Sequence, residues 1–380
     1  MAIPALVVTC ESTWLAPIRM PGALARAGFE VTLLSPPDAL AARSRHVARS
    51  HTLPDKANAQ AWLLALAAAV DAARPAIVFP GDETSLRLMQ TFVLTPPRLL
   101  SGATTRMLAD LFVHSIGVPR FYDAATDKAR LAPLMRDAGV RVPEYVMVHS
   151  AGDAARAAYE FGEVVVKPSN GTGSRDVVVC TTPDAAADAF RRACAGNRGL
   201  AVFDREPAVL VQRRIRGPML GRTGVAFRGR ELAGFARQRL HTIRPLGGST
   251  VVRYLHAPEA TQFSRRTADA LGLTGFFSLE LCIDAESGFA YLIDLTRRMA
   301  PPTHTGALVG VDLCAALARA LVGQFDPPLD LPPDFSHTMT LFPQEFWRDP
   351  QSPALRAHPM DVPWDDPHLL RELLQWGYEI

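Results

Sequence analysis

Apolar and polar positions alternate in blocks that predict strands and helices in turn over the first 120 residues. Short apolar runs at 5–10, 29–34 and 75–79 are typical of buried strands. Helical patterns lie between and after them, at 21–28, at 59–74 and beyond Gly81. Strands that alternate with helices predict a parallel sheet with helices on both of its faces.

The middle of the chain changes to patterns typical of antiparallel strands. Two Val-rich runs flank a small-residue loop between 162 and 179, and 209–217 is a further strand that enters a loop. The segments 221–227 and 231–240 predict an antiparallel pair across a short turn. Helices are expected between and after these strands, at 129–138, 182–195, 261–271, 311–322 and 368–375.

A predicted hairpin over 275–298 contains several of the candidate functional residues. Its turn contains Asp284, Ser287 and Gly288, and apolar residues alternate onto one face of both strands. The period of two places four polar residues on the opposite face: Glu280, Asp294, Thr296 and Arg298. Pairing across a turn of this length brings Glu280 directly or diagonally opposite Asp294.

Two carboxylates this close repel each other unless a cation lies between them. Mg²⁺ is typically held by one or two carboxylates together with substrate phosphates. The hairpin therefore predicts a metal platform, and the alternative is a solvated polar face that carries two scattered acids.

Lys167 ends a buried-type strand and is followed by a loop that contains Gly171 and Gly173. Glycines allow the backbone N–H groups of a loop to wrap a phosphate, and a lysine supplies a positive charge to the same anion. The lysine precedes the loop, which is the reverse of the Walker A order, so a P-loop is excluded. The alternative is a turn with a solvated lysine.

Composition narrows the class of protein without naming it. The 380 residues are 48% hydrophobic and 21% charged, with a net charge of +2, so nothing indicates nucleic acid or an anionic membrane as partner. The five cysteines lack metal-binding spacing and suggest a reducing compartment. No apolar run reaches membrane-spanning length, so we expect a cytoplasmic protein with two or three domains.

The N-terminal sheet carries no dinucleotide fingerprint. After the first strand stands Glu11-Ser-Thr-Trp14, with no GxGxxG, so no dinucleotide site is predicted. Glu11, Asp82 and Glu83 follow predicted strands at the edge where α/β sheets bind ligands. Capping and turn roles are the alternative for these three acids.

In this order the motifs resemble the ATP-grasp superfamily, in its carboxylate–amine ligase branch near the carbamoyl-phosphate-synthetase-like group. The resemblance covers about residues 1–325. It includes Asp127-Lys128, the Lys167 loop, Leu210 to Gly217, Gly247-Gly248-Ser249, and the hairpin that ends in Asp294-Leu-Thr296-Arg-Arg298. It implies a Rossmann-like parallel α/β domain (1–120), then a two-lobed ATP-grasp domain with antiparallel sheets (121–325, lid lobe about 145–210). A Pro-rich, partly helical extension (326–380) has no recognised counterpart.

The resemblance also implies roles, residue by residue. Lys128 and Lys167 match the lysines that contact nucleotide phosphates, and Arg298 matches the arginine that stabilises phosphoryl transfer; Lys167 and Arg298 are the catalytic candidates. Glu280 and Asp294 match the acidic Mg²⁺ ligands, with Thr296 beside them. The mobile phosphate-covering loop would comprise Ser169, Gly171, Thr172, Gly173 and Ser174, and the adenine-reading segment Gln212, Arg213, Arg214 and Ile215.

Three positions depart from the usual pattern of that family. Gln212 and Arg216 stand where glutamates usually flank the adenine segment, which weakens the expectation of ribose recognition. Asp294 is shorter than the usual glutamate. Thr296 replaces an asparagine, and a hydroxyl is a poorer magnesium ligand than an amide oxygen.

The resemblance implies an enzyme that uses ATP and Mg²⁺ to join a small-molecule carboxylate to an amine through an acyl phosphate. It allows for a homodimer. A non-catalytic nucleotide-binding protein, or a carboxylase or acyl kinase, is the alternative. Arg239, Arg244, Arg253 and Arg297 are candidates to hold the carboxylate, and His304 is a candidate to line the acceptor pocket or is structural.

Overall fold

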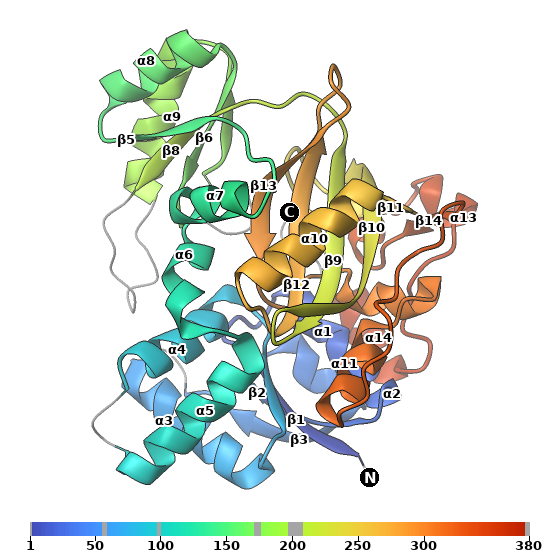
Figure 1. The fold of residues 1–380 in the computed structure, drawn as a ribbon. Coiled ribbons are helices and arrows are strands. Elements are labelled where there is room, and N and C mark those ends of the chain that lie inside the picture. The colour runs from blue at the N-terminus through green and yellow to red at the C-terminus, as the bar shows by residue number, and fades with distance from the viewer. Residues whose placement is uncertain (1, 55–58, 97–99, 171–175, 197–207, 377–380) are drawn as a thin grey trace.

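The computed structural model describes residues 2–54, 59–96, 100–170, 176–196 and 208–376. These residues form three β-sheets with helices around them (Figure 1). The predicted loop residues Gly171, Thr172, Gly173 and Ser174 lie outside the described residues. Figure 1 shows the N-terminal sheet below, the largest sheet in the middle and a small sheet with its two helices above.

The N-terminal sheet is parallel, as predicted, with the strand order β3-β2-β1-β4. Its strands are β1 (Ile3–Val8), β2 (Phe29–Ser35), β3 (Val47–Thr52) and β4 (Ile77–Pro80). Successive residues of β1 enter different cores, since Val7 packs in one cluster and Leu6 in another. Burial on both faces is why these strands read as continuous apolar runs. The edge strand β3 is polar and largely exposed, and its sequence gave no strand signal.

Helices cover both faces of the parallel sheet and connect it to the rest of the chain. They are α1 (Leu15–Ile18), α2 (Met20–Arg26), η1 (Leu40–Arg43), α3 (Ala59–Ala73), α4 (Glu83–Leu94), α5 (Gly102–Ile116), η2 (Pro119–Phe121) and α6 (Tyr122–Thr126).

The small sheet is antiparallel, with the order β5-β8-β6-β7. Its strands are β5 (Tyr145–Val148), β6 (Val164–Pro168), β7 (Val178–Cys180) and β8 (Val209–Arg213). Helices α8 (Ala151–Phe161) and α9 (Pro183–Gly196) pack on it through alanines, including Ala154, Ala158 and Ala189. Small side chains let helices and sheet approach closely in this lobe.

The central sheet has six strands in the order β13-β12-β9-β10-β11-β14, and every neighbouring pair is antiparallel. Its strands are β9 (Met219–Phe227), β10 (Arg230–Thr242), β11 (Ser249–Leu255), β12 (Gly275–Ile283), β13 (Ala290–Thr296) and β14 (Ser336–Thr340). One face packs on α7 (Lys128–Asp137) and α10 (Pro258–Ala270), and the other on α11 (Leu313–Leu321) and the N-terminal sheet. The predicted combination of a parallel α/β sheet with antiparallel sheets is confirmed.

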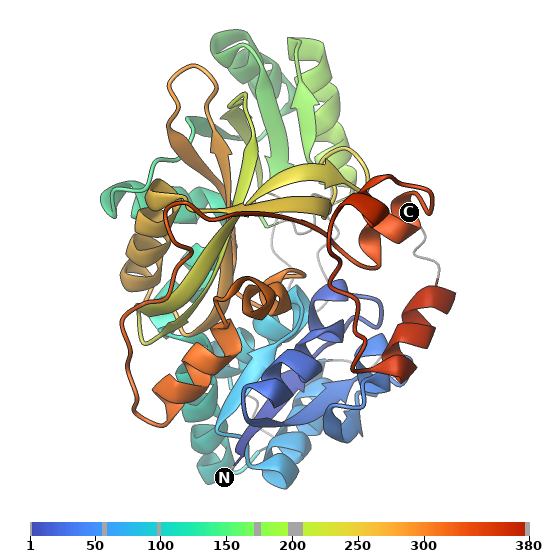
Figure 2. The same ribbon diagram turned by 90° about the vertical axis from the view of Figure 1, so that its right-hand side faces the viewer.

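The C-terminal block is the part of the chain from residue 326 onward. It contributes β14 to the central sheet and then runs back along the N-terminal helices, as Figure 2 shows. Its helices are α12 (Gln344–Arg348), α13 (Ala354–Ala357) and α14 (Pro367–Gln375). The short helix η3 (Thr303–Val309) lies earlier in the chain, between β13 and α11. Leu369 and Leu373 of α14 pack with Ile18 and Leu40, so this block joins two sheets.

Among the described residues, no single helix is long and apolar enough to cross a membrane, although η3 and α11, bent by 100° at their junction, pass such a test as a pair by length and composition.

Candidate active site between three sheets

Of the two arrangements predicted for the hairpin acids, directly or diagonally opposite, the pairing of β12 with β13 shows the direct one. Glu280 lies directly opposite Asp294, and Ser278 lies opposite Thr296. Directly opposite residues of an antiparallel pair point to the same face, so both acids and Thr296 face the same side of the sheet. This is the face that turns toward the N-terminal domain, because Phe276 on the same face packs against Phe79 of β4.

The row of residues that contains the two acids continues across the sheet to a buried arginine. Gly221 on β9 pairs with Glu280 on one side and with Arg237 of β10 on the other. Gly221 has no side chain, and a Cβ there would lie 2.6 Å from Arg237 Nη1. The glycine therefore leaves the space through which the Arg237 guanidinium crosses β9 toward Glu280.

Two guanidinium groups meet the Glu280 carboxylate. Arg237 Nη2 lies 3.4 Å from one oxygen and Arg239 Nη2 lies 3.0 Å from the other. Arg237 also donates a hydrogen bond of 2.8 Å from Nη1 to the Thr223 hydroxyl. Arg237 is buried, and burial lowers the pKa of its guanidinium, while the Glu280 charge acts in the opposite direction. Arg237 was not among the residues predicted from the sequence, although its spacing of two from Arg239 on a strand was a usable signal.

Asp294, the other acid, has a different cation. Lys128 Nζ lies 3.3 Å from Asp294 Oδ1. Lys128 begins α7, whose N-cap is Asp127, and the Asp127 carboxylate accepts hydrogen bonds from Ala129 N and from the Ser169 hydroxyl. The Lys128 N–H in turn donates to the Ser169 carbonyl at 3.1 Å. The N-cap thus ties α7 to the start of the predicted phosphate loop.

Lys167 lies at the end of β6 and points into the same region. Its Nζ donates to Gln212 Oε1 at 2.9 Å and to the Ile293 carbonyl at 3.1 Å. Burial, and to a lesser extent the nearby Lys128 charge, lower the pKa of Lys167 from 10.5 to about 8, and the Asp294 carboxylate opposes both. The structure therefore brings together Lys128, Lys167 and Asp294, which come from three different elements.

An apolar slot runs from these charges between the small sheet and the hairpin. Its lining combines a few polar groups with aliphatic side chains and Tyr145: Lys128, Leu131, Ala132, Val142, Tyr145, Lys167, Leu210, Gln212, Leu292, Ile293 and Asp294. A concave apolar lining with a few convergent polar groups is typical of a small-molecule site.

The segment predicted to read adenine follows the slot on β8. Gln212 is buried and faces Lys167, whereas Arg213 pairs with Glu144 at 2.8 Å on the exposed side. Arg214 and Arg216 both pair with Glu163, at 2.9 and 2.7 Å. The Ile215 carbonyl accepts a weak hydrogen bond from the Cys282 thiol at 3.5 Å. Arg216, which stands where an acid was expected, is thus an exposed ion-pair partner of the small lobe.

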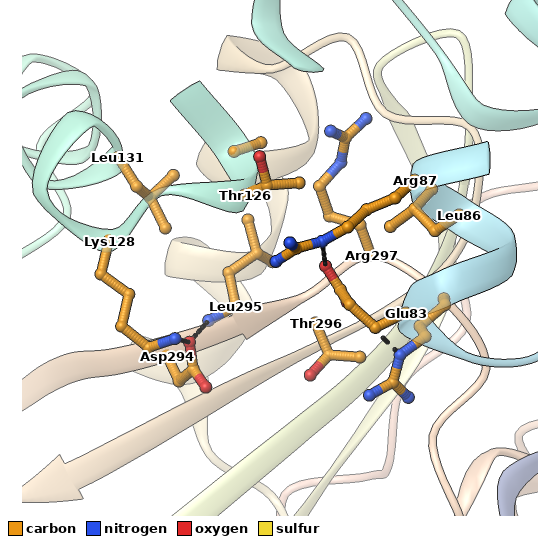
Figure 3. A pocket seen from close by; sticks show the side chains of 12 residues that line it. Glu83, Leu86, Arg87, Thr126, Lys128, Leu131, Asp294, Leu295, Thr296 and Arg297 are labelled. Atoms are coloured by element: carbon orange, nitrogen blue, oxygen red, sulfur yellow. Dashed lines mark hydrogen bonds and ion pairs between the residues drawn. The ribbon is translucent and has the colours of Figure 1, made fainter. Parts of the chain in front are cut away.

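A second pocket joins the hairpin to the N-terminal domain (Figure 3). Its lining comprises Glu83, Leu86, Arg87, Ala125, Thr126, Lys128, Leu131, Asp294, Leu295, Thr296, Arg297 and Arg298. Figure 3 shows Asp294 with Lys128 on one side of the pocket and Glu83 with Arg87 on the other.

Arg298 contacts two residues of the N-terminal domain and the carbonyl of the residue that follows it. Its Nε lies 3.6 Å from Glu83 Oε2, its guanidinium lies 4.8 Å from the centre of the Trp14 ring, and Nη1 donates to the Met299 carbonyl at 3.0 Å. Arg87 holds Glu83 from the other side at 3.2 Å. Glu83 was predicted from the sequence as a strand-end acid, but no local pattern connects Trp14 or Arg87 with Arg298, because these contacts join distant parts of the chain.

The other basic candidates fall in different places. Arg244 and Arg253 are exposed, and neither lines the two pockets. Arg297 is buried and donates to the Ile116 carbonyl at 3.0 Å; burial lowers its pKa to about 10. His304 is buried, with Nε2 2.7 Å from Asp361. Its contacts are therefore those of a structural histidine, which was one of the two roles expected for it.

The donor set on the sheet fits a magnesium ion that takes most of its ligands from phosphates and water. Within the described part of the chain, no group of three or more His, Cys, Asp or Glu side chains could hold a metal alone. Two carboxylates in direct register and the Thr296 hydroxyl provide the oxygen ligands that Mg²⁺ prefers when it is shared with a nucleotide.

Comparison with solved structures extends this picture. The biotin carboxylase domain of 2-oxoglutarate carboxylase from Hydrogenobacter thermophilus, solved with MgADP, ADP and bicarbonate, has a TM-score of 0.65 at 16% identity, over 89% of this chain and 74% of that one. N5-carboxyaminoimidazole synthetase from Staphylococcus aureus with ADP has a TM-score of 0.63 at 12% identity, over 89% and 82%. L-amino acid ligase from Bacillus licheniformis has a TM-score of 0.58 at 16% identity, over 84% and 75%.

No family model matches the sequence, and no curated protein matches it. The structural matches nevertheless cover most of the chain and agree on one architecture. The chain has the ATP-grasp fold, so the fold expected from the sequence motifs is confirmed.

Proposed function

We propose that this chain is an ATP-dependent, ADP-forming ligase that activates a small-molecule carboxylate as an acyl phosphate and joins it to an amine. The observation that carries the proposal is the register of β12 and β13, which sets Glu280 opposite Asp294 with Lys128 ion-paired to Asp294. The similarity to solved structures with ADP and MgADP supports ATP and Mg²⁺ as the nucleotide and cofactor.

The nucleotide would occupy the apolar slot, with its phosphates toward the charged end. The aliphatic lining and Tyr145 suit the adenine ring, and the Gln212 side chain offers polar groups for its edge. Lys128 and Lys167 would bind the phosphates. Glu280, Asp294 and Thr296 would hold Mg²⁺, which supplies charge neutralisation of the phosphates when bound.

The chemistry would take place where the two pockets meet. A carboxylate oxygen of the substrate attacks the γ-phosphorus, the bond to the β-phosphate oxygen breaks, and ADP leaves. The amine then attacks the acyl carbon, phosphate leaves, and the amine loses a proton as the amide forms. Arg298, oriented by Glu83 and Trp14, would stabilise charge on the transferred phosphoryl group. Phosphoryl transfer depends mainly on such positioning and charge stabilisation.

A direct test measures ADP release from MgATP with a panel of amino acids, each as carboxylate and as amine. Arg298→Ala should lower kcat by about 10²- to 10³-fold, a loss typical when one stabilising donor is removed. Arg49→Gln on the edge strand β3, 60% exposed, is the matched control and should leave the rate unchanged. Full activity of Arg298→Ala would contradict the proposed role.

Bicarbonate belongs in the same panel, because one similar structure is a carboxylase domain solved with bicarbonate. ADP release that requires bicarbonate would favour a carboxylase. An acyl phosphate that hydroxylamine traps, with no amide product, would favour an acyl kinase. MgATP binding without ADP release across the panel would favour a regulatory nucleotide-binding protein.

A further inference from the structure

Two roles of the Glu280 carboxylate compete: it pairs with two arginines, and it is a proposed ligand of magnesium. In the structure both of its carboxylate oxygens contact guanidinium groups, those of Arg237 and Arg239. The same carboxylate is the proposed magnesium ligand opposite Asp294. A carboxylate that coordinates Mg²⁺ gives up much of its charge to the metal, so it no longer neutralises two arginines.

Arg237 has no alternative anion among the described groups around it. It also donates to the neutral Thr223 hydroxyl at 2.8 Å, and its side chain is only 8% exposed. A buried guanidinium that loses its carboxylate is strongly destabilised unless another anion takes its place. When Glu280 binds the metal, another anion beside Arg237 would therefore stabilise the buried guanidinium.

The open side of this cluster shows where that anion can enter. Arg239 and Glu280 are 21% and 26% exposed, whereas Arg237, which lies over Gly221 of β9, is buried. An arriving carboxylate or phosphate would meet Arg239 first and Arg237 behind it. Guanidinium groups bind these planar or tetrahedral anions with two N–H donors each.

We propose that Glu280 is an exchangeable counterion: without nucleotide it occupies the anion site of Arg237 and Arg239, and when it turns to the nucleotide's metal, that site becomes available to the carboxylate or acyl-phosphate group of the substrate. The identity of this anion rests on the proposed function; the anion site itself does not. The arrangement makes substrate binding depend on prior nucleotide binding, so that the carboxylate enters only when a phosphoryl donor is present.

The test uses inorganic phosphate as the probe and the nucleotide-free protein, measured by calorimetry. Glu280→Gln keeps the shape of the side chain and removes its charge, which frees the two arginines. This variant should bind phosphate about tenfold or more tightly than the wild type. The double variant Glu280→Gln with Arg239→Gln should lose that gain, whereas Glu280→Gln with Arg49→Gln should keep it.

Wild-type protein provides an independent arm if the Glu280 variant folds poorly. Phosphate should bind the MgADP-saturated protein about tenfold more tightly than the nucleotide-free protein, and Arg239→Gln should remove this difference while MgADP affinity stays within about twofold. Unchanged phosphate affinity in a folded Glu280→Gln protein, or a MgADP effect that Arg239→Gln leaves intact, would overturn the proposal. Failure of MgADP to bind at all would instead refute the proposed function.

Discussion

At the scale of single residues, the site depends on charged side chains that are buried away from solvent. Lys167 is buried beside a second lysine, and among the described residues its amino group donates to the Gln212 side chain and the Ile293 carbonyl. Desolvation disfavours the charged form of such an amine, which is why the pKa of Lys167 falls to about 8. A phosphate placed beside it would favour the charged form and raise that pKa again.

The pKa of Lys167 predicts how nucleotide affinity depends on pH. Binding to phosphate requires the protonated amine, so the affinity for MgADP should be full below pH 8 and fall above it, by up to about tenfold per pH unit. Titrations between pH 7 and 9.5 would measure this slope. Lys167→Arg keeps its charge over the whole range and should give a flat profile, so a wild-type profile as flat as that of the arginine variant would contradict the prediction.

At the scale of elements, one buried carboxylate shapes the edge of the N-terminal sheet that faces the site. Asp82 caps α4 through Ser85 N, and its other oxygen accepts from the Thr9 hydroxyl and from the N–H groups of Cys10 and Glu11. Asp82 is fully buried. The sequence left two roles open for Asp82, ligand binding at the strand end or capping and turn formation, and its contacts are those of a capping and turn residue. Its effect on the site is to hold the loop that carries Trp14 over Arg298.

Asp82→Asn should destabilise the protein, because an amide nitrogen would face donors that now meet a carboxylate. The free energy of unfolding should fall by about 2 to 4 kcal/mol, the range expected when several hydrogen bonds to a buried charge are disrupted. Urea denaturation measures it. Asp71→Asn, an exposed change on α3, should stay within about 0.5 kcal/mol. A similar loss in both variants would remove the special role of Asp82.

At the scale of the whole molecule, the C-terminal block packs against both the central sheet and the N-terminal domain. Asp361 accepts from Phe342 N at 2.6 Å, lies 2.7 Å from His304 Nε2 and 3.6 Å from the buried Arg19 guanidinium. The three partners come from the block itself, from η3 and from the N-terminal domain. Asp361 therefore joins segments that lie more than 300 residues apart in the sequence.

Asp361→Asn should weaken this junction strongly, because Arg19 would lose its counterion and His304 would lose its buried carboxylate partner. We expect a loss of about 3 to 5 kcal/mol of unfolding free energy, measured by thermal or urea denaturation. Asp365→Asn is a close control, since its pairs with Arg26 and His46 lie at the surface and such pairs contribute about 1 kcal/mol or less. Equal losses in the two variants would show that burial of Asp361 is unimportant.

The sequence by itself determined the features that depend on local pattern. Period-two alternation and a short turn placed Glu280 directly or diagonally opposite Asp294, and runs buried on both faces marked β1, β2 and β4 of the parallel sheet. The order of Lys128, Lys167, Glu280 and Asp294 along the chain led to the correct fold. The roles of the individual site residues remain predictions, and those of 171–174 concern residues outside the described part of the chain.

The tertiary structure alone decided which charges meet. That Arg237 crosses Gly221 to reach Glu280 follows from the order β12-β9-β10, and that Glu83 and Trp14 hold Arg298 follows from packing of the sheet face on the N-terminal domain. These contacts join positions tens to hundreds of residues apart, and no local periodicity encodes such pairings. The hairpin thus specified two adjacent carboxylates, and only the assembled sheets gave each of them a different cationic partner.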